Sequence, residues 1–220
     1  LDGDTATGNP DTDQAVVVYF GDGASSQGDV SEALVFAASY QTPQVFFLQN
    51  NHWAISVPVT RQSRTPLYLR SGGFGIPGIQ IDGNDVLASY AITASALDDA
   101  RSGKGPRFIE ALTYRMGAHT TSDDPTKYRD DAELEFWTRN DPIARYEAFL
   151  RFRGEGEAFF ADVATEAEDV ASDIRARTLA LGVPEAASMF AHVYSEPHPV
   201  MEAQSDWLAA YEASFEEGQA

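Results

Sequence analysis

Cysteine and long apolar runs are both missing from this chain of 220 residues, and each absence excludes a class of protein. Without cysteine there are no disulfide bonds, no thiolate metal sites and no cysteine nucleophile, which suits a reducing compartment. No apolar run approaches the roughly 18 residues of a membrane span, and no basic stretch followed by an apolar one indicates a signal peptide. We therefore expect a cytoplasmic protein without a membrane segment.

Basic residues are also scarce, since 15 lysines and arginines stand against 34 aspartates and glutamates. The formal net charge of -19 at pH 7 would repel a phosphate backbone, which excludes general nucleic-acid binding. The acidic excess is larger in the second half of the chain, as expected for the solvated faces of surface helices. Because 43% of the residues are hydrophobic, the chain can bury a core, and its length fits one domain or one and a half.

The chain opens on Leu1 and on a polar stretch over residues 1–14. This stretch leads directly into an apolar run and has the composition of a linker. We therefore expect the chain to be a fragment of a longer protein.

Short apolar runs alternate with helical patterns in the first half of the chain. Strands are expected at 15–20, 44–49, 78–83 and 106–114, and helices at 29–41 and 85–103. The runs "AVVVYF" and "QVFFLQ" are typical of parallel strands covered on both faces, and the helix between them is apolar nearly all round, which predicts that it is buried. This order predicts an α/β fold with a parallel sheet, flanking helices and right-handed crossovers.

The sequence changes character after residue 114. The polar stretch "RMGAHTTSDDPTKYRDD" (115–131) has no apolar periodicity, and a loop of this length is usually functional or disordered. Surface helices are expected within 132–152, 157–181 and 199–218. We expect an α/β domain over 1–131, which includes a loop at 114–131, followed by a helical extension over 132–220 for subunit packing.

A glycine turn with one carboxylate follows the first expected strand. The stretch "GDGASSQGD" (21–29) places Asp22 at the carboxyl end of that strand, which is where open parallel sheets bind ligands. The next strand ends in Asn50 and Asn51, and the 26 residues between Gly23 and Asn50 allow one helix and one strand. We therefore expect Asp22 and Asn51 to face one another across adjacent strand ends.

This pair of side chains suits a magnesium site. A carboxylate, an amide carbonyl and a nearby backbone carbonyl are hard oxygen ligands, and they leave positions on Mg²⁺ for phosphate oxygens and water. Gly21 and Gly23 would let the backbone turn tightly and approach phosphates. Alone, "GDG" is better explained as a plain glycine turn with a capping aspartate, but "NN" behind a second strand favours the metal site.

"GDG", 26 residues and then "NN" resembles the thiamine diphosphate motif. The flanking stretches "YFGDGASSQGD", "QNNHWAIS", "GIPGIQIDGNDV" and "YRMGAHTTSDDPTKYR" resemble the α-chain of the thiamine-diphosphate-dependent decarboxylating component of 2-oxo acid dehydrogenase complexes. The resemblance runs from about residue 15 to the end, is strongest up to Arg153, and does not separate pyruvate from branched-chain members. It implies oxidative decarboxylation of a 2-oxo acid with acyl transfer to a lipoyl group, and the cofactors thiamine diphosphate and Mg²⁺.

The resemblance also implies roles for single residues. The metal ligands would be Asp22, the side chain of Asn51 and the main-chain carbonyl of Trp53, which stands where many members have tyrosine. Ile55 would prop the cofactor in its bent conformation, and His119 would contact the cofactor and assist acyl transfer, since imidazole exchanges protons near neutral pH. The implied cofactor-binding residues are Gly21, Asp22, Gly23, Ala24, Asn51, Trp53, Ile55, Arg115 and His119.

The loop around His119 carries further matches to the family. In relatives, the residues at the positions of Arg115, Asp123, Tyr128 and Arg129 form a hydrogen-bonded network, so the resemblance implies an ordered loop. Without the resemblance, a histidine in a polar loop would be interpreted as exposed and inert.

Other residues carry weaker signals. Some relatives are phosphorylated on the serine that follows the loop histidine; Thr120 holds that position here, and phosphorylation of Thr120 or Ser122 is left open. The remaining histidines have no partner pattern and are expected to be structural: His52, His192 and His198.

The family's partners are implied as well: a β subunit in a heterotetramer (α2β2), a lipoyl-bearing acyltransferase core and a small 2-oxo acid. In relatives a longer N-terminal region completes the sheet and the diphosphate site, and the β subunit supplies the activating glutamate. Residues 1–220 alone are therefore not expected to turn over substrate. Two alternatives stay open: an acetoin dehydrogenase α-chain, and a non-catalytic scaffold subunit, against which intact Asp22, Asn51 and His119 argue.

Overall fold

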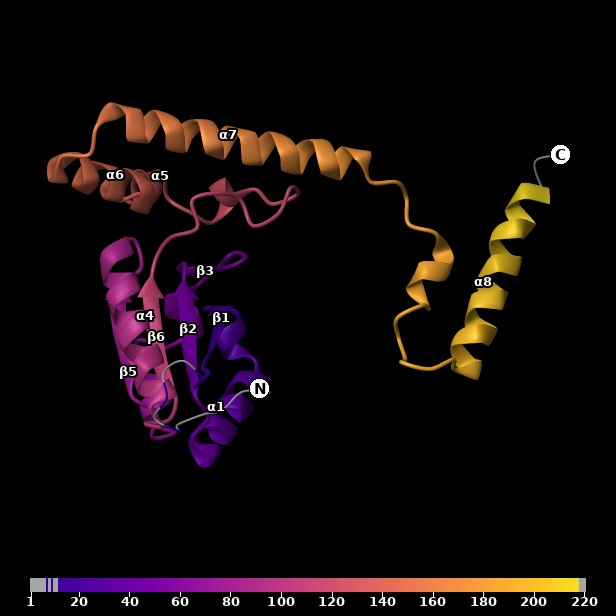
Figure 1. The fold of residues 1–220 in the computed structure, drawn as a ribbon, viewed down its shortest axis with the longest axis horizontal. Helices are drawn as coiled ribbons and strands as arrows, with labels where there is room; N and C mark the ends of the chain where they lie inside the picture. The colour runs from indigo at the N-terminus through magenta and orange to yellow at the C-terminus, as the bar shows by residue number, and fades with distance from the viewer. Residues whose placement is uncertain (1–6, 8, 10–11, 218–220) are drawn as a thin grey trace. The chain divides into compact units, whose positions relative to one another are not determined.

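The structure is a computed structural model that describes residues 7, 9 and 12–217 (Figure 1). Most of the polar opening stretch expected over 1–14 lies outside the described residues. The chain divides into two compact units, Leu1–Glu155 and Gly156–Ala220. The boundary expected at residue 131 stays a prediction.

A four-stranded parallel sheet forms the centre of the first unit (Figure 1). Its spatial order is β1 (Val16–Gly21), β2 (Gln44–Asn50), β6 (Arg107–Leu112) and β5 (Gly78–Asp82). All neighbouring strands are parallel, and the register pairs Gly21 with Gln49 and Asp82 with Leu112. The carboxyl ends of the strands therefore meet at one edge of the sheet, and the expected α/β fold with a parallel sheet is confirmed.

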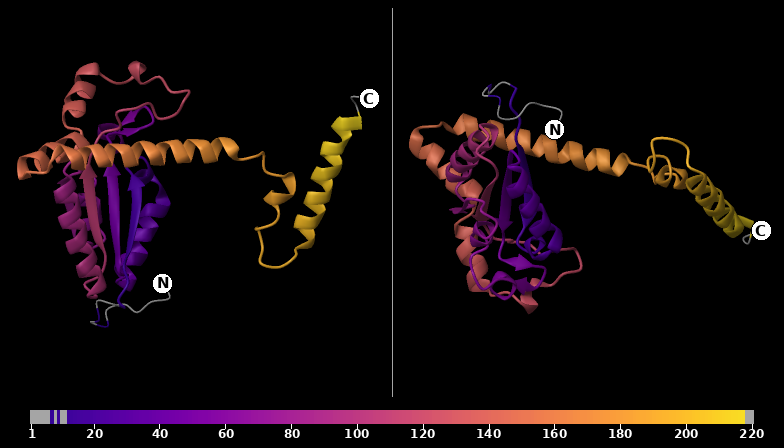
Figure 2. Two further views of the ribbon diagram at one scale, coloured as in Figure 1. Left: turned by 45° about the horizontal axis from the view of Figure 1, so that its top comes forward. Right: turned by 90° about the horizontal axis from the view of Figure 1, so that it is seen from below.

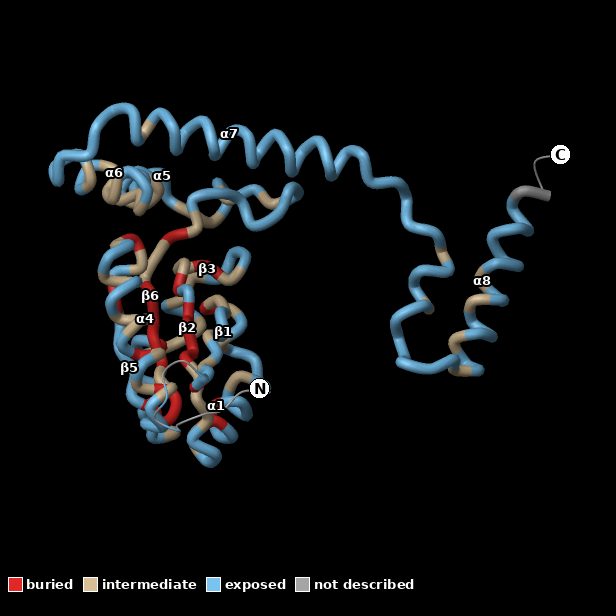
Figure 3. The backbone as a smooth tube through the Cα atoms, viewed as in Figure 1, coloured by how far each residue is buried: buried red, intermediate tan, exposed pale blue. Residues whose placement is uncertain are grey.

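Helices cover both faces of this sheet (Figure 2). Because successive side chains of a strand point to opposite faces, β2 supplies two separate cores. On one face, α1 (Gly28–Tyr40) joins a core that contains Leu34, Ala37, Phe46, Leu48 and Phe108. On the other face, α4 (Val86–Arg101) joins a core that contains Val45, Phe47, Ala96, Ile109 and Ala111. The continuous apolar run of β2 thus results from burial on both sides (Figure 3).

Two expectations about burial are wrong. α1 is not buried all round, since its side chains Val35, Phe36 and Tyr40 are exposed. β1 is not covered on both faces either, because it forms an edge of the sheet and its Tyr19 is 61% exposed. The apolar patterns therefore identified the helix and the strand correctly, but the burial of each depends on its neighbours.

Several short elements of the first unit carry no clear sequence pattern. After β2 the chain forms a small antiparallel hairpin of β3 (Trp53–Ala54) and β4 (Val57–Pro58). The single-turn helices α2 (Val59–Gln62) and α3 (Leu69–Gly72) follow. These elements are too short for a hydrophobic period to show, yet they surround the carboxyl end of β1 and β2.

Two helices close the first unit, α5 (Asp131–Arg139) and α6 (Pro142–Arg153). The chain breaks between them because the Asp141 side chain accepts hydrogen bonds from the first backbone N–H groups of α6, and Pro142 starts that helix. Arg145 of α6 donates to Asp82 at 2.9 Å, so α6 is tied to the carboxyl end of β5.

The second unit consists of α7 (Glu157–Ala180), a short 3-10 helix η3 (Ala186–Met189) and α8 (Pro199–Glu217). Most of its described residues are exposed (Figure 3). Among the described residues, no helix is both long enough and apolar enough to cross a membrane.

Candidate functional site

The first half of the candidate site lies where β1 ends. Asp22 follows the last residue of the strand and is only 1% exposed. Among the described residues its side chain accepts one hydrogen bond, from Gln62 Nε2 at 2.7 Å, and pairs with no cation. Burying a carboxylate is costly unless the charge is compensated, so this carboxylate fits a position at which it binds a cation.

Arg70 holds the turn after β1 in place. Its guanidinium donates to the backbone carbonyl of Ser25 at 3.0 Å and to that of Gln62 at 3.2 Å. The turn and α2 are therefore clamped together beside Asp22. A hollow of about 530 Å³ lies next to this clamp, with Ser25, Gln62 and Arg70 in its wall.

Close packing explains one of the two glycines in the turn. A Cβ added to Gly23 would lie 2.9 Å from the Cβ of Ala54 in β3. A Cβ added to Gly21 would meet no atom within 4 Å, and neither glycine has a positive φ. The steric need for glycine is therefore found at Gly23, where the chain after β2 passes directly over the turn after β1.

The second half of the site lies where β2 ends. The side-chain oxygen Oδ1 of Asn50 accepts a hydrogen bond from the backbone N–H of His52 at 3.0 Å, and Oδ1 of Asn51 accepts one from the backbone N–H of Trp53 at 3.1 Å. These two successive Asx turns redirect the chain into the hairpin, with His52 at a φ of 71°. Because β1 and β2 are parallel neighbours, Asp22 and Asn51 follow adjacent strand ends, as expected.

Arg115 holds the backbone of the hairpin. It donates to the carbonyl of Trp53 at 3.3 Å and to that of Ile55 at 2.7 Å. A carbonyl oxygen has two lone pairs, so the Trp53 carbonyl keeps one for a further partner. Ile55 has a φ of 55°, a conformation that costs a β-branched residue about 1–3 kcal/mol, and its side chain is 55% exposed. Strain of this kind clusters at functional positions.

The loop after β6 contains the expected hydrogen-bonded network. Arg115 donates to the Tyr128 hydroxyl at 2.8 Å, and this hydroxyl donates to the Asp123 carboxylate. The same carboxylate oxygen accepts the backbone N–H of His119 at 2.9 Å. His119 is thus placed through its backbone, while its imidazole is exposed and makes no hydrogen bond within the described part of the chain.

Arg129 forms the second part of the network. Its guanidinium donates to the backbone carbonyls of Arg115 and Met116 and lies 5.6 Å from the centre of the Tyr114 ring. The loop is therefore tied back to the segment that leaves β6.

Hydrogen bonding also shifts the pKa values of two groups in the loop, Asp123 and Tyr128. The hydrogen bond from the Tyr128 hydroxyl, followed by that from the His119 backbone, holds the pKa of Asp123 below its usual range. Desolvation, followed by the hydrogen bond to Asp123, raises the pKa of Tyr128. At neutral pH the two groups are therefore a carboxylate and a phenol, the forms that their hydrogen bond requires.

The donor set fits Mg²⁺ and a diphosphate. Asp22, Asn51 and the Trp53 carbonyl supply hard oxygen atoms at neighbouring strand ends, which is the ligand type that Mg²⁺ prefers. Arg115 reaches the same hairpin, and the loop network connects it to His119.

Sequence reasoning missed Gln62, Arg70 and Ala54. Gln62 and Arg70 lie on or beside single-turn helices, and Ala54 is in a strand of two residues. No periodic pattern marks such elements, so the only available signal was their position shortly after "NN".

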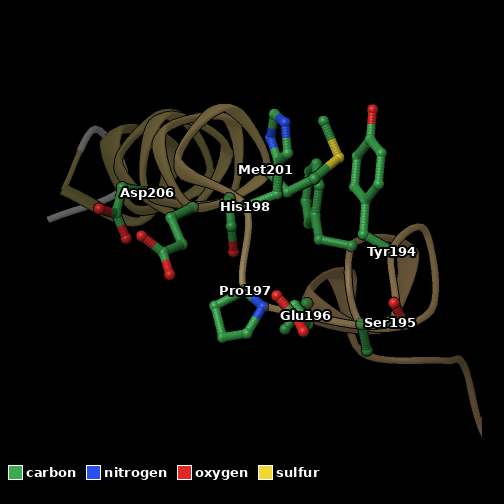
Figure 4. A pocket seen from close by; sticks show the side chains of 12 residues that line it. Tyr194, Ser195, Glu196, Pro197, His198, Met201 and Asp206 are labelled. Atoms are coloured by element: carbon green, nitrogen blue, oxygen red, sulfur yellow. The ribbon is translucent and has the colours of Figure 1, made fainter.

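A separate hollow of about 460 Å³ lies in the second unit, between η3 and the start of α8 (Figure 4). Tyr194 stacks on His198 there with ring centres 4.3 Å apart, and Glu196 and Asp206 lie in the wall. It contains none of the expected site residues.

Comparison with known proteins places the site in a family context. The model of the dehydrogenase E1 component matches residues 5–170. The chain is 46% identical over 202 residues to the 3-methyl-2-oxobutanoate dehydrogenase subunit alpha of Mycobacterium tuberculosis, which covers 91% of this chain and 55% of that protein. It is 40% identical over 200 residues to the pyruvate dehydrogenase E1 component subunit alpha of Acholeplasma laidlawii, and that match covers 88% of this chain and 57% of that protein. The chain thus spans about half the length of the curated relatives it matches.

Proposed function

The chain belongs to the dehydrogenase E1 component family, and from this premise we propose that it is the cofactor-holding part of the α subunit of a thiamine-diphosphate-dependent 2-oxo acid dehydrogenase. Its sheet and flanking helices would be part of the thiamine diphosphate-binding fold. Bound thiamine diphosphate supplies the electron sink for decarboxylation. The observation that supports the proposal is that Asn51 and the buried Asp22 follow adjacent parallel strand ends, with the Trp53 backbone turned back onto the Asn51 side chain.

Each residue of the site would have a distinct task. Asp22, Asn51 and the Trp53 carbonyl would hold Mg²⁺, and the backbone from Gly21 to Ala24 would face the diphosphate. Ile55 would support the apolar part of the cofactor, because its side chain is exposed and its backbone carbonyl is held by Arg115.

The loop would serve the second half of the reaction. The exposed imidazole of His119 would give or accept a proton at the lipoyl group, and the network of Asp123 and Tyr128 would hold the loop for that encounter. The complete enzyme would need a β subunit, in a heterotetramer of two copies of each chain, and a lipoyl-bearing acyltransferase core. The helical extension over 132–220 would pack against other subunits.

The proposed substrate is a small 2-oxo acid. The names of the two relatives include 3-methyl-2-oxobutanoate and pyruvate, and both acids present the same carboxylate and oxo group to the cofactor. They differ in the bulk of the side chain, which an apolar pocket distinguishes by about 10–200-fold per methylene. Both acids therefore have to be tested.

The test uses the full-length protein co-expressed with its β subunit. With thiamine diphosphate and Mg²⁺ present, reduction of an artificial electron acceptor is followed with pyruvate, 3-methyl-2-oxobutanoate and acetoin in separate reactions. We expect turnover with one of the two 2-oxo acids. Asp22→Ala should lower it at least about 100-fold, since it removes a direct metal ligand. Asp29→Ala, at an exposed position in the first turn of α1, is the matched control and should leave the rate unchanged.

Three results would contradict the proposal. Turnover with acetoin alone would indicate an acetoin dehydrogenase α-chain. A folded pair of subunits without turnover on any substrate would indicate a scaffold subunit. Full activity in Asp22→Ala would refute the role of the turn after β1.

A further inference from the structure

Glu110 is a buried carboxylate that the proposed chemistry does not use. It lies on β6 and is 1% exposed. Its oxygens accept three hydrogen bonds, from Asn50 Nδ2 at 2.7 Å, the Tyr68 backbone N–H at 2.9 Å and Gln80 Nε2 at 3.0 Å. All three donors are neutral, and within the described ranges no lysine, arginine or histidine pairs with this carboxylate.

Packing alone does not explain an acid at this position. The neighbouring residues of β6 are apolar and buried: Phe108, Ile109 and Ala111. A buried carboxylate without a cationic partner is costly, and an apolar side chain would fill the same space without that cost. The three donors come from β2, β5 and the segment before α3, so Glu110 holds three separate parts of the chain.

The hydrogen bond between Glu110 and Asn50 fixes the orientation of the Asn50 side-chain amide. A carboxylate can only accept, so it selects the NH₂ end of the Asn50 side chain. The carbonyl end is then directed to the backbone N–H of His52, 3.0 Å away. That bond holds His52 at its φ of 71° and begins the turn in which Asn51 accepts from Trp53.

We propose that Glu110 is a positioning residue for the metal site. Through Asn50 it orients the turn that carries the oxygen ligands of Asn51 and Trp53. This inference rests on the proposed function, because it assumes that Mg²⁺ binds there. Glu110 is not one of the proposed metal ligands, and it acts on the site only through its hydrogen bond with Asn50. Loss of an outer partner of a metal ligand typically lowers metal affinity about 10–100-fold.

The first variant is E110Q, which keeps the volume of the side chain but replaces one acceptor with a donor. The new NH₂ group must face either the Asn50 amide or the donors of Tyr68 and Gln80. In the full-length α subunit with its β partner, we expect the apparent Kd for Mg²⁺ to rise about 10–100-fold. It is measured by calorimetry at saturating thiamine diphosphate, without any need for turnover.

A control separates orientation from simple destabilisation. Ile109 is the next residue along β6, is 0% exposed and faces the other side of the sheet. I109V should lower the melting temperature while leaving the Kd for Mg²⁺ within about threefold of the wild type, because it touches no part of the turn.

A double variant reverses the hydrogen bond. In N50D/E110Q the amide introduced at position 110 can donate to the carboxylate introduced at position 50. The other oxygen of that carboxylate can still accept from the backbone N–H of His52. We expect the Kd for Mg²⁺ to return to within about fivefold of the wild type, whereas N50D alone places two carboxylates together and should weaken binding. If E110Q does not fold, E110D replaces it as the test, because it keeps the carboxylate on a side chain too short to hold Asn50 and should also raise the Kd for Mg²⁺.

The outcomes distinguish this inference from the proposed function. A wild-type protein without Mg²⁺-dependent cofactor binding would contradict the proposed function itself. Wild-type binding together with an unchanged Kd in E110Q would overturn the positioning role and leave the proposed function standing. A weakened E110Q that N50D/E110Q does not rescue would also overturn it.

Discussion

The close contact between Gly23 and Ala54 leads to a quantitative prediction. Gly23→Ala places a methyl group 2.9 Å from the Ala54 Cβ, which is shorter than real Cβ contacts. Ala54 has no flexible side chain that could move away, so β3 or the turn itself must shift. Because the turn carries Asp22 and β3 carries Trp53, the shift should separate two of the proposed metal ligands.

The magnitude follows from two opposing effects. Overpacking of this kind costs about 1–3 kcal/mol. Gly23 has a φ of -61° and a ψ of -45°, which alanine adopts freely, so the loss of chain entropy in the unfolded state returns about 0.4–1 kcal/mol. We expect a net loss of about 1–2 kcal/mol in the free energy of unfolding. A Cβ at Gly21 meets no atom within 4 Å, so only the entropy effect applies there, and Gly21→Ala should raise stability by about 0.4–1 kcal/mol.

The assay is a double-mutant cycle with Ala54→Gly. Removing the Ala54 methyl leaves the Ala54 Cα as the nearest atom, at 3.5 Å, which is an ordinary contact. The double variant should therefore be more stable than the sum of the single changes by about 1 kcal/mol, measured by urea unfolding of the full-length protein. Its Mg²⁺ affinity should recover in parallel. Additive effects would refute the argument that this contact sets the geometry of the turn.

The remaining predictions concern the hairpin and the loop. Ile55→Gly should raise the free energy of unfolding in urea by about 1 kcal/mol, since it releases the strained φ, and should weaken thiamine diphosphate binding. A lower free energy of unfolding would show that the backbone of Ile55 is not strained. The ionised Asp123 carboxylate stabilises the loop above its ordinary pKa of 3.8, and this stabilisation is lost as the pH falls through its lowered pKa. Tyr128→Phe removes the main hydrogen-bond donor to Asp123 and should move the loss of loop order to higher pH, as measured by hydrogen exchange over 115–131. His119→Asn should slow acyl transfer to a lipoyl domain about 100-fold or more, while the free energy of unfolding stays within about 0.5 kcal/mol of the wild type. An unchanged transfer rate would exclude proton transfer by His119.

The parallel sheet and the edge at which its strands end could be predicted from local patterns. The apolar run of β2 is continuous because both faces of this strand are buried, and burial on both faces is typical of parallel sheets. The placement of Asp22 and Asn51 after adjacent strand ends could be predicted because the end of a strand is visible in the sequence, and parallel strands bring their carboxyl ends to one edge. The direct match of the loop to a known family located His119 and its network.

Contacts between distant segments could not be predicted in this way. Gln62 reaches Asp22 across 40 residues of sequence, and Glu110 reaches Asn50 across 60. No hydrophobic period or motif encodes such a pair, because each depends on how loops and strands pack in three dimensions. The burial of α1 was mispredicted for the same reason, since an apolar helix is covered only where another element lies against it.

The sequence by itself therefore determined the class of the fold, the strand ends and the kind of chemistry that their side chains suit, since each depends on local composition and spacing. The tertiary structure alone decided which neighbours hold those side chains: Ala54 against Gly23, Gln62 on Asp22 and Glu110 on Asn50. The physical reason is that close packing and hydrogen bonding act over a few ångströms in space, whatever the separation along the chain.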